Sequence, residues 1–345
     1  MFTMYSFIIY KSLTMKEIKY LFWSIFAIIC AFGLFGGPAN ALAVAVSPVV
    51  IEHDLAPGMS ASGKIRVTNT MDEDAVYYIG AQRFLPVGEE GRQEYIVNEE
   101  DVMSFYKWFS FNENKLIIPP KSTVEVEYTI NAPLDAEPGG HYGAVFLSLD
   151  PPDLEPETTG SKIAPKTGVL FLVKVAGDIT EQANIESFTV NKKVLSHLPA
   201  FFDLRIRNTG NIHFRPKGTL EIRNMWGGVV ARVPANPRNS AVLPSSIRRI
   251  NTWWAKSETM ASGGRFIDGL ANEWHNFALG RYTAKVDVKY GSSNTAFPAQ
   301  EVSFWVIPWR MGLILFIALV ILFFVMKAYN KAIVSKAIKN SSKKK

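Results

Sequence analysis

The sequence predicts an all-β protein in which two β-sandwich domains follow one another between two apolar segments. Three observations lead to this fold class. Short stretches of alternating apolar and polar residues recur between residues 44 and 305, where helical periodicity is nearly absent. Apolar runs flanked by lysines lie near both ends of the chain. The length of 345 residues is enough for two domains of ordinary size.

The first apolar run, Leu21–Gly37, has the layout of a signal peptide. Lysines precede it, and the small residues of Ala39–Ala43 follow it and offer two Ala-x-Ala cleavage sites. We therefore expect a signal peptide over residues 1–43, with Met15 as an alternative start; an uncleaved signal anchor is the other interpretation. Cys30, the only cysteine, lies inside this run. A processed chain would have no disulfide, which is typical of a bacterial surface protein with a sizeable core.

Residues 44–178 are expected to form the first β-sandwich. Strands that alternate between apolar and polar residues bury one face and expose the other, and seven of them are typical of an immunoglobulin-like domain. Between the third and fourth strands, Glu89–Phe111 is less regular and contains a potential short helix, Val102–Tyr106. The expected strands are Val44–Ile51, Gly63–Asn69, Ala75–Arg83, Lys115–Ile118, Thr123–Asn131, Ala144–Asp150 and Gly168–Val175.

The Pro- and acid-rich stretch Asp150–Lys166 has two interpretations. Its composition is typical of a linker between domains. We favour a long hairpin loop, because Gly168–Val175 supplies the last strand that the first domain needs, and this places the domain boundary near Gly177–Glu181. On this interpretation, the loop and the glycine-rich turn Gly139–Gly143 are neighbouring ends of one hairpin and share a contact surface.

Residues 179–306 are expected to form a second immunoglobulin-like sandwich, again with seven strands. A short echo links the two domains, because Ile65–Thr70 and Leu204–Thr209 are both strands that end in Asn-Thr, where the asparagine can cap its own turn. The expected strands are Ile185–Asn191, Phe201–Arg207, Gly218–Asn224, Val229–Val233, Ser246–Trp254, Gly280–Tyr290 and Gln300–Val306.

The second apolar run, Met311–Met326, predicts a transmembrane helix over residues 307–327. Together with Trp305–Arg310 it is long enough to cross a hydrocarbon core of about 30 Å. Tryptophans at one end and Tyr329 at the other match an aromatic belt. The lysine-rich tail, residues 328–345, is expected in the cytoplasm by the positive-inside rule. The sequence thus predicts a single-pass type I protein of the cell membrane, with residues 44–305 outside.

The net charge of +6 belongs to the flanks of the apolar runs. Three lysines precede the first run, and Arg310 and seven lysines follow residue 309, so 26 of the 37 basic residues remain in between, against 30 of the 31 acidic ones. The middle of the chain is therefore slightly acidic. This distribution argues against binding to nucleic acid.

Motifs that carry catalysis are missing from the sequence. The five histidines lack zinc spacing, and no nucleophile signature occurs. We therefore expect no enzyme activity, no catalytic residues, no metal and no cofactor. Turn geometry explains the glycine-rich run, which lacks the lysine of a phosphate-binding loop. For binding, the best candidates are turn and aromatic residues, namely Gly139, Gly140, His141, Tyr142 and Trp226, of which Trp226 stands in a predicted hairpin turn.

Several stretches resemble the WxL-interacting protein family of Gram-positive surface proteins. Ser47-Pro48 with Pro57-Gly58, the strand Ile65–Thr70 and the run Gly139–Ala144 resemble the opening domain of that family. The strand and turn of Leu204–Gly210 are similar in plan to its second domain. The order of signal peptide, two sandwiches, one transmembrane helix and lysine tail also matches, and the chain contains no W-x-L tripeptide of its own.

The resemblance implies that the first domain contacts peptidoglycan and that the second contacts surface proteins. The leading prediction is therefore a membrane-anchored bacterial surface protein that binds cell-wall polymer, surface protein partners or both. Two alternatives stay open. One is a chaperone-like module that adds a strand to a partner's sheet, and the other is an accessory subunit of a membrane complex.

Overall fold

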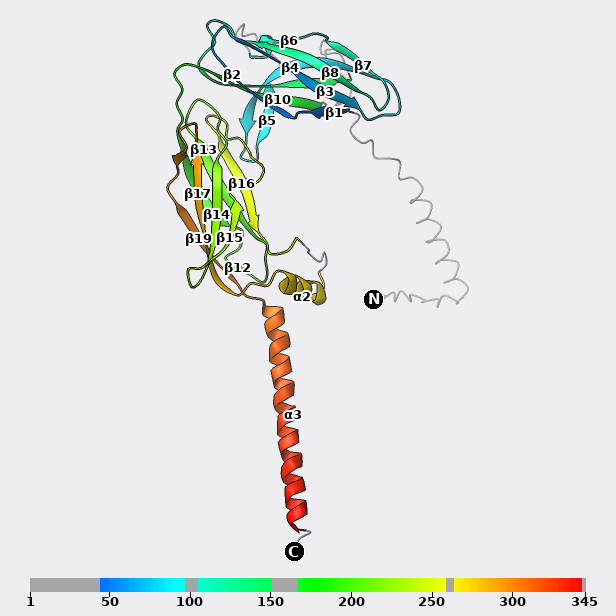
Figure 1. Cartoon of the computed structure of the whole chain (residues 1–345), viewed down its shortest axis with the longest axis vertical. Helices are drawn as coiled ribbons and strands as arrows, with labels where there is room; N and C mark the ends of the chain where they lie inside the picture. Colours follow the sequence, from blue (N-terminus) through cyan, green and yellow to red (C-terminus); the bar gives the residue numbers. More distant parts are fainter. Residues whose placement is uncertain (1–43, 97–104, 150–166, 259–263, 343–345) are drawn as a thin grey trace, which may run out of the picture.

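The computed structural model describes residues 44–96, 105–149, 167–258 and 264–342. The predicted signal peptide, Cys30 and the acidic stretch Asp150–Lys166 lie outside these residues. Figure 1 shows two β domains, with the first lying across one end of the second and a long helix leaving the opposite end. The prediction of two tandem β-sandwiches followed by a C-terminal apolar helix is confirmed.

Domain 1 is a sandwich of a four-stranded sheet, in the order β1-β3-β8-β6, and a six-stranded sheet, in the order β2-β10-β9-β4-β5 with β7 paired to β4. Its elements are β1 (Val44–Ser47), β2 (Val50–Leu55), β3 (Ser60–Asn69), β4 (Ala75–Val87), β5 (Arg92–Ile96), the 3-10 helix η1 (Phe105–Trp108), β6 (Phe109–Phe111), β7 (Lys115–Ile118), β8 (Thr123–Asn131), β9 (Gly139–Ser148) and β10 (Thr167–Val175). The single strand expected over Val44–Ile51 is in fact two, because β1 pairs with β3 whereas β2 crosses to the other sheet and pairs in parallel with β10.

Strands β9 and β10 are antiparallel neighbours, with Leu147 opposite Thr167 at one end and Gly139 opposite Val175 at the other. Residues 149–166 therefore connect adjacent strands of one sheet. The Gly139–Gly143 turn lies at the other end of the same strand pair. The acidic loop itself lies outside the described residues, so the expectation that it shares a contact surface with this turn stays a prediction.

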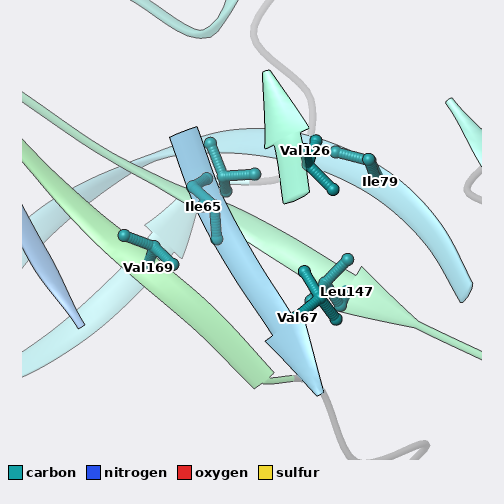
Figure 2. A pocket seen from close by; sticks show the side chains of 7 residues that line it. Ile65, Val67, Ile79, Val126, Leu147 and Val169 are labelled. Carbon is teal, nitrogen blue, oxygen red and sulfur yellow. The ribbon is translucent and has the colours of Figure 1, made fainter. Parts of the chain in front are cut away.

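The core of domain 1 combines aliphatic and aromatic side chains, and the aliphatic ones gather in its middle. Figure 2 shows Ile65, Val67 and Val126 from one sheet opposite side chains of the other sheet, around a gap of about 10 Å³. A gap of this size, lined by apolar side chains alone, is a packing defect that neither water nor a ligand would fill.

Domain 2 repeats the plan with a three-stranded sheet, β11-β13-β16, and a six-stranded sheet, β12-β19-β17-β14-β15 with β18 paired to β17. Its strands are β11 (Ala183–Val190), β12 (Val194–Leu195), β13 (Ala200–Asn208), β14 (Lys217–Asn224), β15 (Val229–Pro234), β16 (Ile247–Trp254), β17 (Gly280–Tyr290), β18 (Thr295–Ala296) and β19 (Gln300–Val306). Between β16 and β17 lies a helix that the sequence analysis does not predict, α2 (Phe266–His275).

Asn69 and Asn208, the asparagines of the sequence echo, have matching roles in the two domains. Both are fully buried. Each amide nitrogen donates to the carbonyl four residues later, at 2.7 and 2.8 Å, and to a carbonyl of a neighbouring segment, Ile118 or Val242, at 3.0 Å. Each amide oxygen accepts the N–H two residues later at 2.9 Å. The asparagine side chain thus supplies hydrogen-bond partners to backbone carbonyl and N–H groups where the chain leaves the strand.

The C-terminal helix α3 (Trp309–Ser342) is continuous over 34 residues. Its first 23 residues, Trp309–Lys331, are long and apolar enough to cross a membrane. The helix continues through most of the lysine-rich tail, because the tail has good helix formers and no proline.

Candidate functional site

The two domains meet at the outer face of the six-stranded sheet of domain 1. Strand β9 is buried on both sides, because Val145 and Leu147 face the core while Tyr142 and Phe146 face domain 2. The outward cluster comprises Phe84, Tyr142, Ala144, Phe146 and Leu172, packed against Ala241 and Leu243 of domain 2. The continuous apolar run of Gly143–Leu147 is the sequence signal of a strand covered on both faces.

Polar contacts fix one side of this interface. The Tyr142 hydroxyl lies at hydrogen-bond distance, 3.2 Å, from Nδ1 of His213, and burial raises the pKa of Tyr142. Burial also lowers the pKa of His213 to about 4, although the Glu52 carboxylate is 3.7 Å from Nε2. Burial opposes ionisation of Glu52 too, but the hydrogen bond and charge of Arg215 hold the pKa of Glu52 below its usual value. The interface therefore favours the neutral form of His213 beside the ion pair of Glu52 and Arg215.

Acid is expected to weaken the interdomain contact through His213. Its pKa of about 4 in the folded chain compares with an ordinary value of 6.5, so the unfolded chain binds more protons between these values. The contribution of His213 to stability is fully present above pH 6.5 and is lost as the pH falls toward 4. The shift corresponds to roughly 3 kcal/mol. Urea unfolding between pH 4 and 7.5 should show that the free energy of unfolding falls more steeply with decreasing pH for the native chain than for His213→Asn. An equal dependence on pH in the two proteins would contradict this account.

The tip of the β4–β5 hairpin fixes the other side. The Glu89 carboxylate accepts a hydrogen bond from Nε of Arg205 at 2.7 Å, and the Glu89 carbonyl accepts the backbone N–H of Arg249 at 2.8 Å. The hairpin thus docks on strands β13 and β16. With contacts on both sides, the angle between the domains is held and the space between the contacts is a defined cleft.

The cleft encloses about 220 Å³ and has an apolar floor and a cationic rim. The floor contains Val50, Phe84, Leu170, Leu172, Ala241 and Leu243, and the rim contains Arg92, Arg215, Arg238 and Arg248. Of these arginines, Arg215 is paired with Glu52, and Arg92 lies 3.8 Å from Glu90.

Arg248 and Arg238 are the two cleft arginines that form no ion pair among the described residues, and Nε of Arg248 is buried without a hydrogen-bond partner. Burial first, and then the charge of Arg238, lower the pKa of Arg248, whereas the charge of Glu90 acts in the opposite direction. The guanidinium of Arg248 lies where a side chain at Gly91 would stand. Two like charges at the edge of a partly dry cleft define a site for an anion.

The glycine-rich candidates of the sequence analysis lie beside this cleft, as parts of the interface. Gly140 donates its N–H to the Asn211 carbonyl at 2.8 Å, and a side chain at Gly139 would press on that same carbonyl. His141 packs at a tilt against Trp108, with 4.6 Å between ring centroids, and contacts the Glu137 carbonyl at 2.8 Å, both within domain 1. Gly139, Gly140 and the buried Tyr142 are the candidates that contact domain 2.

Trp226 lies far from the cleft. It stands in the β14–β15 turn with 82% of its surface exposed. The turn is at the end of domain 2 where α3 begins, because Asn224 pairs with Tyr282 near the start of β17. The structure therefore does not bring Trp226 together with the other four candidates.

Sequence reasoning missed the arginine rim because its members are far apart in the chain. Arg92 belongs to β5, Arg238 to the segment after β15, and Arg248 to the start of β16. Only the packing of domain 1 on domain 2 brings them together. In the part of the chain that the structure describes, no group of three or more His, Cys, Asp or Glu side chains could hold a metal ion.

Comparisons with known proteins add a likeness of fold. The chain matches no family model and no curated protein sequence, so the resemblance to the WxL-interacting family stays a prediction. Among solved structures, a chaperone–tip adhesin complex of CFA/I fimbriae biogenesis aligns with 77% of this chain and 100% of its own, at 14% identity and a TM-score of 0.35. The class 5 fimbrial chaperone CfaA aligns with 77% of this chain and 99% of its own, at 15% identity and a TM-score of 0.34.

The Pseudomonas aeruginosa CupB2 chaperone aligns with 76% of this chain and 100% of its own, at 10% identity and a TM-score of 0.31. All three TM-scores lie below 0.5, and no property of these chaperones is carried over to this chain.

Proposed function

We propose that this protein is a membrane-anchored binding protein that holds an anionic segment of a protein partner in its interdomain cleft. The observation that carries the proposal is the pair Arg238 and Arg248, which stands without a carboxylate partner in the described chain at the edge of an apolar floor. A guanidinium in a partly desolvated position favours a carboxylate or phosphate, with which it forms charge-assisted hydrogen bonds.

The apolar floor favours a polypeptide over a wall polymer as the ligand. Leu170, Leu172 and Leu243 offer aliphatic surface, which fits apolar side chains, whereas sugars are bound on exposed aromatic rings. An extended peptide with a carboxylate at its end or on a side chain would satisfy the floor and the rim together. This is a binding function without a reaction.

The proposal includes the membrane topology that the sequence predicts. Helix α3 would cross the membrane once, with both β domains outside the cell and the lysine tail in the cytoplasm. The cleft would then face the extracytoplasmic space, at a distance from the membrane set by domain 2. This position suits capture of a partner that is secreted or held at the surface.

Removing the Arg248 side chain is expected to weaken binding of an acidic peptide by about 10- to 100-fold, since charge-assisted hydrogen bonds contribute roughly 1.5–3 kcal/mol. The probe is a fluorescein-labelled decapeptide of alternating valine and threonine with a free C-terminal carboxylate, and the readout is fluorescence anisotropy with the full chain in nanodiscs. Arg238→Ala should act in the same direction.

Two controls make the result specific. Arg66→Ala removes an exposed arginine from the opposite sheet of domain 1 and should leave the affinity unchanged. The same peptide with a C-terminal amide should bind about as weakly as the carboxylate peptide binds to Arg248→Ala. Equal affinity for acid and amide would contradict the proposal. Binding of isolated peptidoglycan that Arg248→Ala abolishes would favour the wall-polymer function instead.

A further inference from the structure

Helix α2 has its apolar side chains on the outside and its polar side chains on the inside. Its buried residues are Gly269, Asn272 and Glu273, of which Glu273 is 0% exposed. The large apolar residues Ile267 and Trp274 are instead 72% and 70% exposed. A surface helix of a water-soluble domain shows the reverse pattern. Such an inverted helix needs an apolar medium against its outer face.

The buried polar side of α2 is bonded to the start of α3. The Glu273 carboxylate accepts hydrogen bonds from the backbone N–H of Met311 at 2.9 Å and from Nη1 of Arg310 at 3.1 Å. The Arg310 guanidinium lies so close to Gly269 that any side chain at position 269 would overlap it. Phe266 packs edge-on against Trp309, with 6.0 Å between ring centroids. Figure 1 shows α2 beside the first turn of α3, so its outer face lies level with the start of the apolar span.

Other exposed aromatic residues lie at the same end of domain 2. The register pairs Arg281 with Trp305 and Asn224 with Tyr282, which places Trp305 and the Trp226 turn at the edge of the sheet from which α3 leaves. Both tryptophans are exposed, as is Trp309 in the first turn of α3. Aromatic rings gathered at one level around a transmembrane span are typical of the boundary between headgroups and acyl chains.

We propose that the outer face of α2, together with Trp226, Trp305 and Trp309, forms a foot that rests in the headgroup region of the bilayer that α3 crosses. The inference rests on the membrane anchoring included in the proposed function. The occupant is lipid because the foot is continuous with the apolar surface of α3 and lies at its entry point. The helix contributes an apolar stripe, and Arg265 and His275 are exposed at its two ends.

Lipid-borne quenchers test the foot in the full chain. In a Cys30→Ser background, single cysteines at Ile267→Cys and Trp226→Cys are labelled with bimane, and the protein is reconstituted into phosphatidylcholine–phosphatidylglycerol vesicles. Lipids with a nitroxide on the headgroup should lower the fluorescence at both positions by at least about two-fold, because labels in the interface lie next to the quencher. The matched control is Ile117→Cys, an isoleucine of domain 1 with 64% exposure, which should keep its fluorescence.

A fourth label separates failure of the foot from failure of the anchor. Val320→Cys stands in the middle of the apolar span, and lipids with a nitroxide deep in the acyl chain should quench it. Loss of quenching at position 320 would overturn the anchoring itself. Quenching at 320 with either 267 or 226 as bright as 117 would overturn the foot and leave the anchor standing. A face covered by a second copy of the chain would give this latter result.

Discussion

Glu273→Ala is expected to lower the free energy of unfolding of domain 2 by about 3–5 kcal/mol, the cost of breaking a buried ion pair by removing one partner. The carboxylate is fully buried and accepts hydrogen bonds from the backbone and side chain of Arg310 and from the N–H of Met311. Its loss leaves the guanidinium without a counter-charge and two N–H groups of the first turn of α3 without an acceptor. Urea unfolding of the full chain in detergent, followed by tryptophan fluorescence, measures the change.

A surface ion pair provides the matched comparison. Glu301 lies 4.0 Å from Lys285 on the exposed face of β19, and Glu301→Ala should cost no more than about 1 kcal/mol. Glu273→Gln keeps an acceptor for the N–H groups, so its effect should fall between the two alanine variants. If Glu273→Ala and Glu301→Ala lowered stability equally, the proposed attachment of α2 to α3 would be wrong.

Asn208→Ala is expected to destabilise domain 2 by about 2–4 kcal/mol, and Asn69→Ala to destabilise domain 1 by a similar amount. Asn208→Ala leaves two buried carbonyls and one buried N–H without their partner. Asn69→Ala leaves the equivalent groups, of which the Ile118 carbonyl is buried and the Glu73 carbonyl and the Met71 N–H are part-buried. Unfolding of each variant in urea, compared with the native chain, gives the two values.

The more stringent test is that the two losses of stability should be similar, because Asn69 and Asn208 make equivalent hydrogen bonds in two different domains. Asn131→Ala is the control, since Asn131 is exposed at the end of β8 and bonds only to the exposed Ser60 hydroxyl among the interactions described for it. It should change stability by no more than about 0.5 kcal/mol. A loss at Asn208 without a comparable loss at Asn69 would show that the sequence echo carries no common role.

Most strands were predictable because they bury one face and expose the other. Strand β17 has the bounds that alternation predicts, Gly280–Tyr290, with alternate side chains buried along its length. The short strands β5 and β6 escaped prediction because their residues alternate weakly and pair only at sheet edges. Helix α2 escaped for another reason. It has only 10 residues, with Gly269 in its middle, and its apolar stripe points away from the domain.

The binding candidates show which features of the site a local sequence pattern does not predict. The glycine-rich run of Gly139–Gly143 stood out locally, and it serves the close approach of two domains, as Gly139 illustrates with its φ of 129° and its position against the Asn211 carbonyl. Arginines such as Arg238 and Arg248 look like ordinary solvated charges in the sequence. Their shared position depends on how one sandwich packs on another, which no local pattern encodes.

The hydrogen bonds from the first turn of α3 to the Glu273 carboxylate couple domain 2 rigidly to the helix. The apolar span of the helix, Trp309–Lys331, has 23 residues, about 35 Å at the usual rise, whereas the hydrocarbon core is about 30 Å thick. An apolar span that exceeds the thickness of its bilayer accommodates by tilting. If α3 crosses the membrane as proposed, a thinner membrane would tilt both β domains through the same angle, because domain 2 is fastened to the first turn of α3. Lipid composition would then set the direction in which the cleft faces.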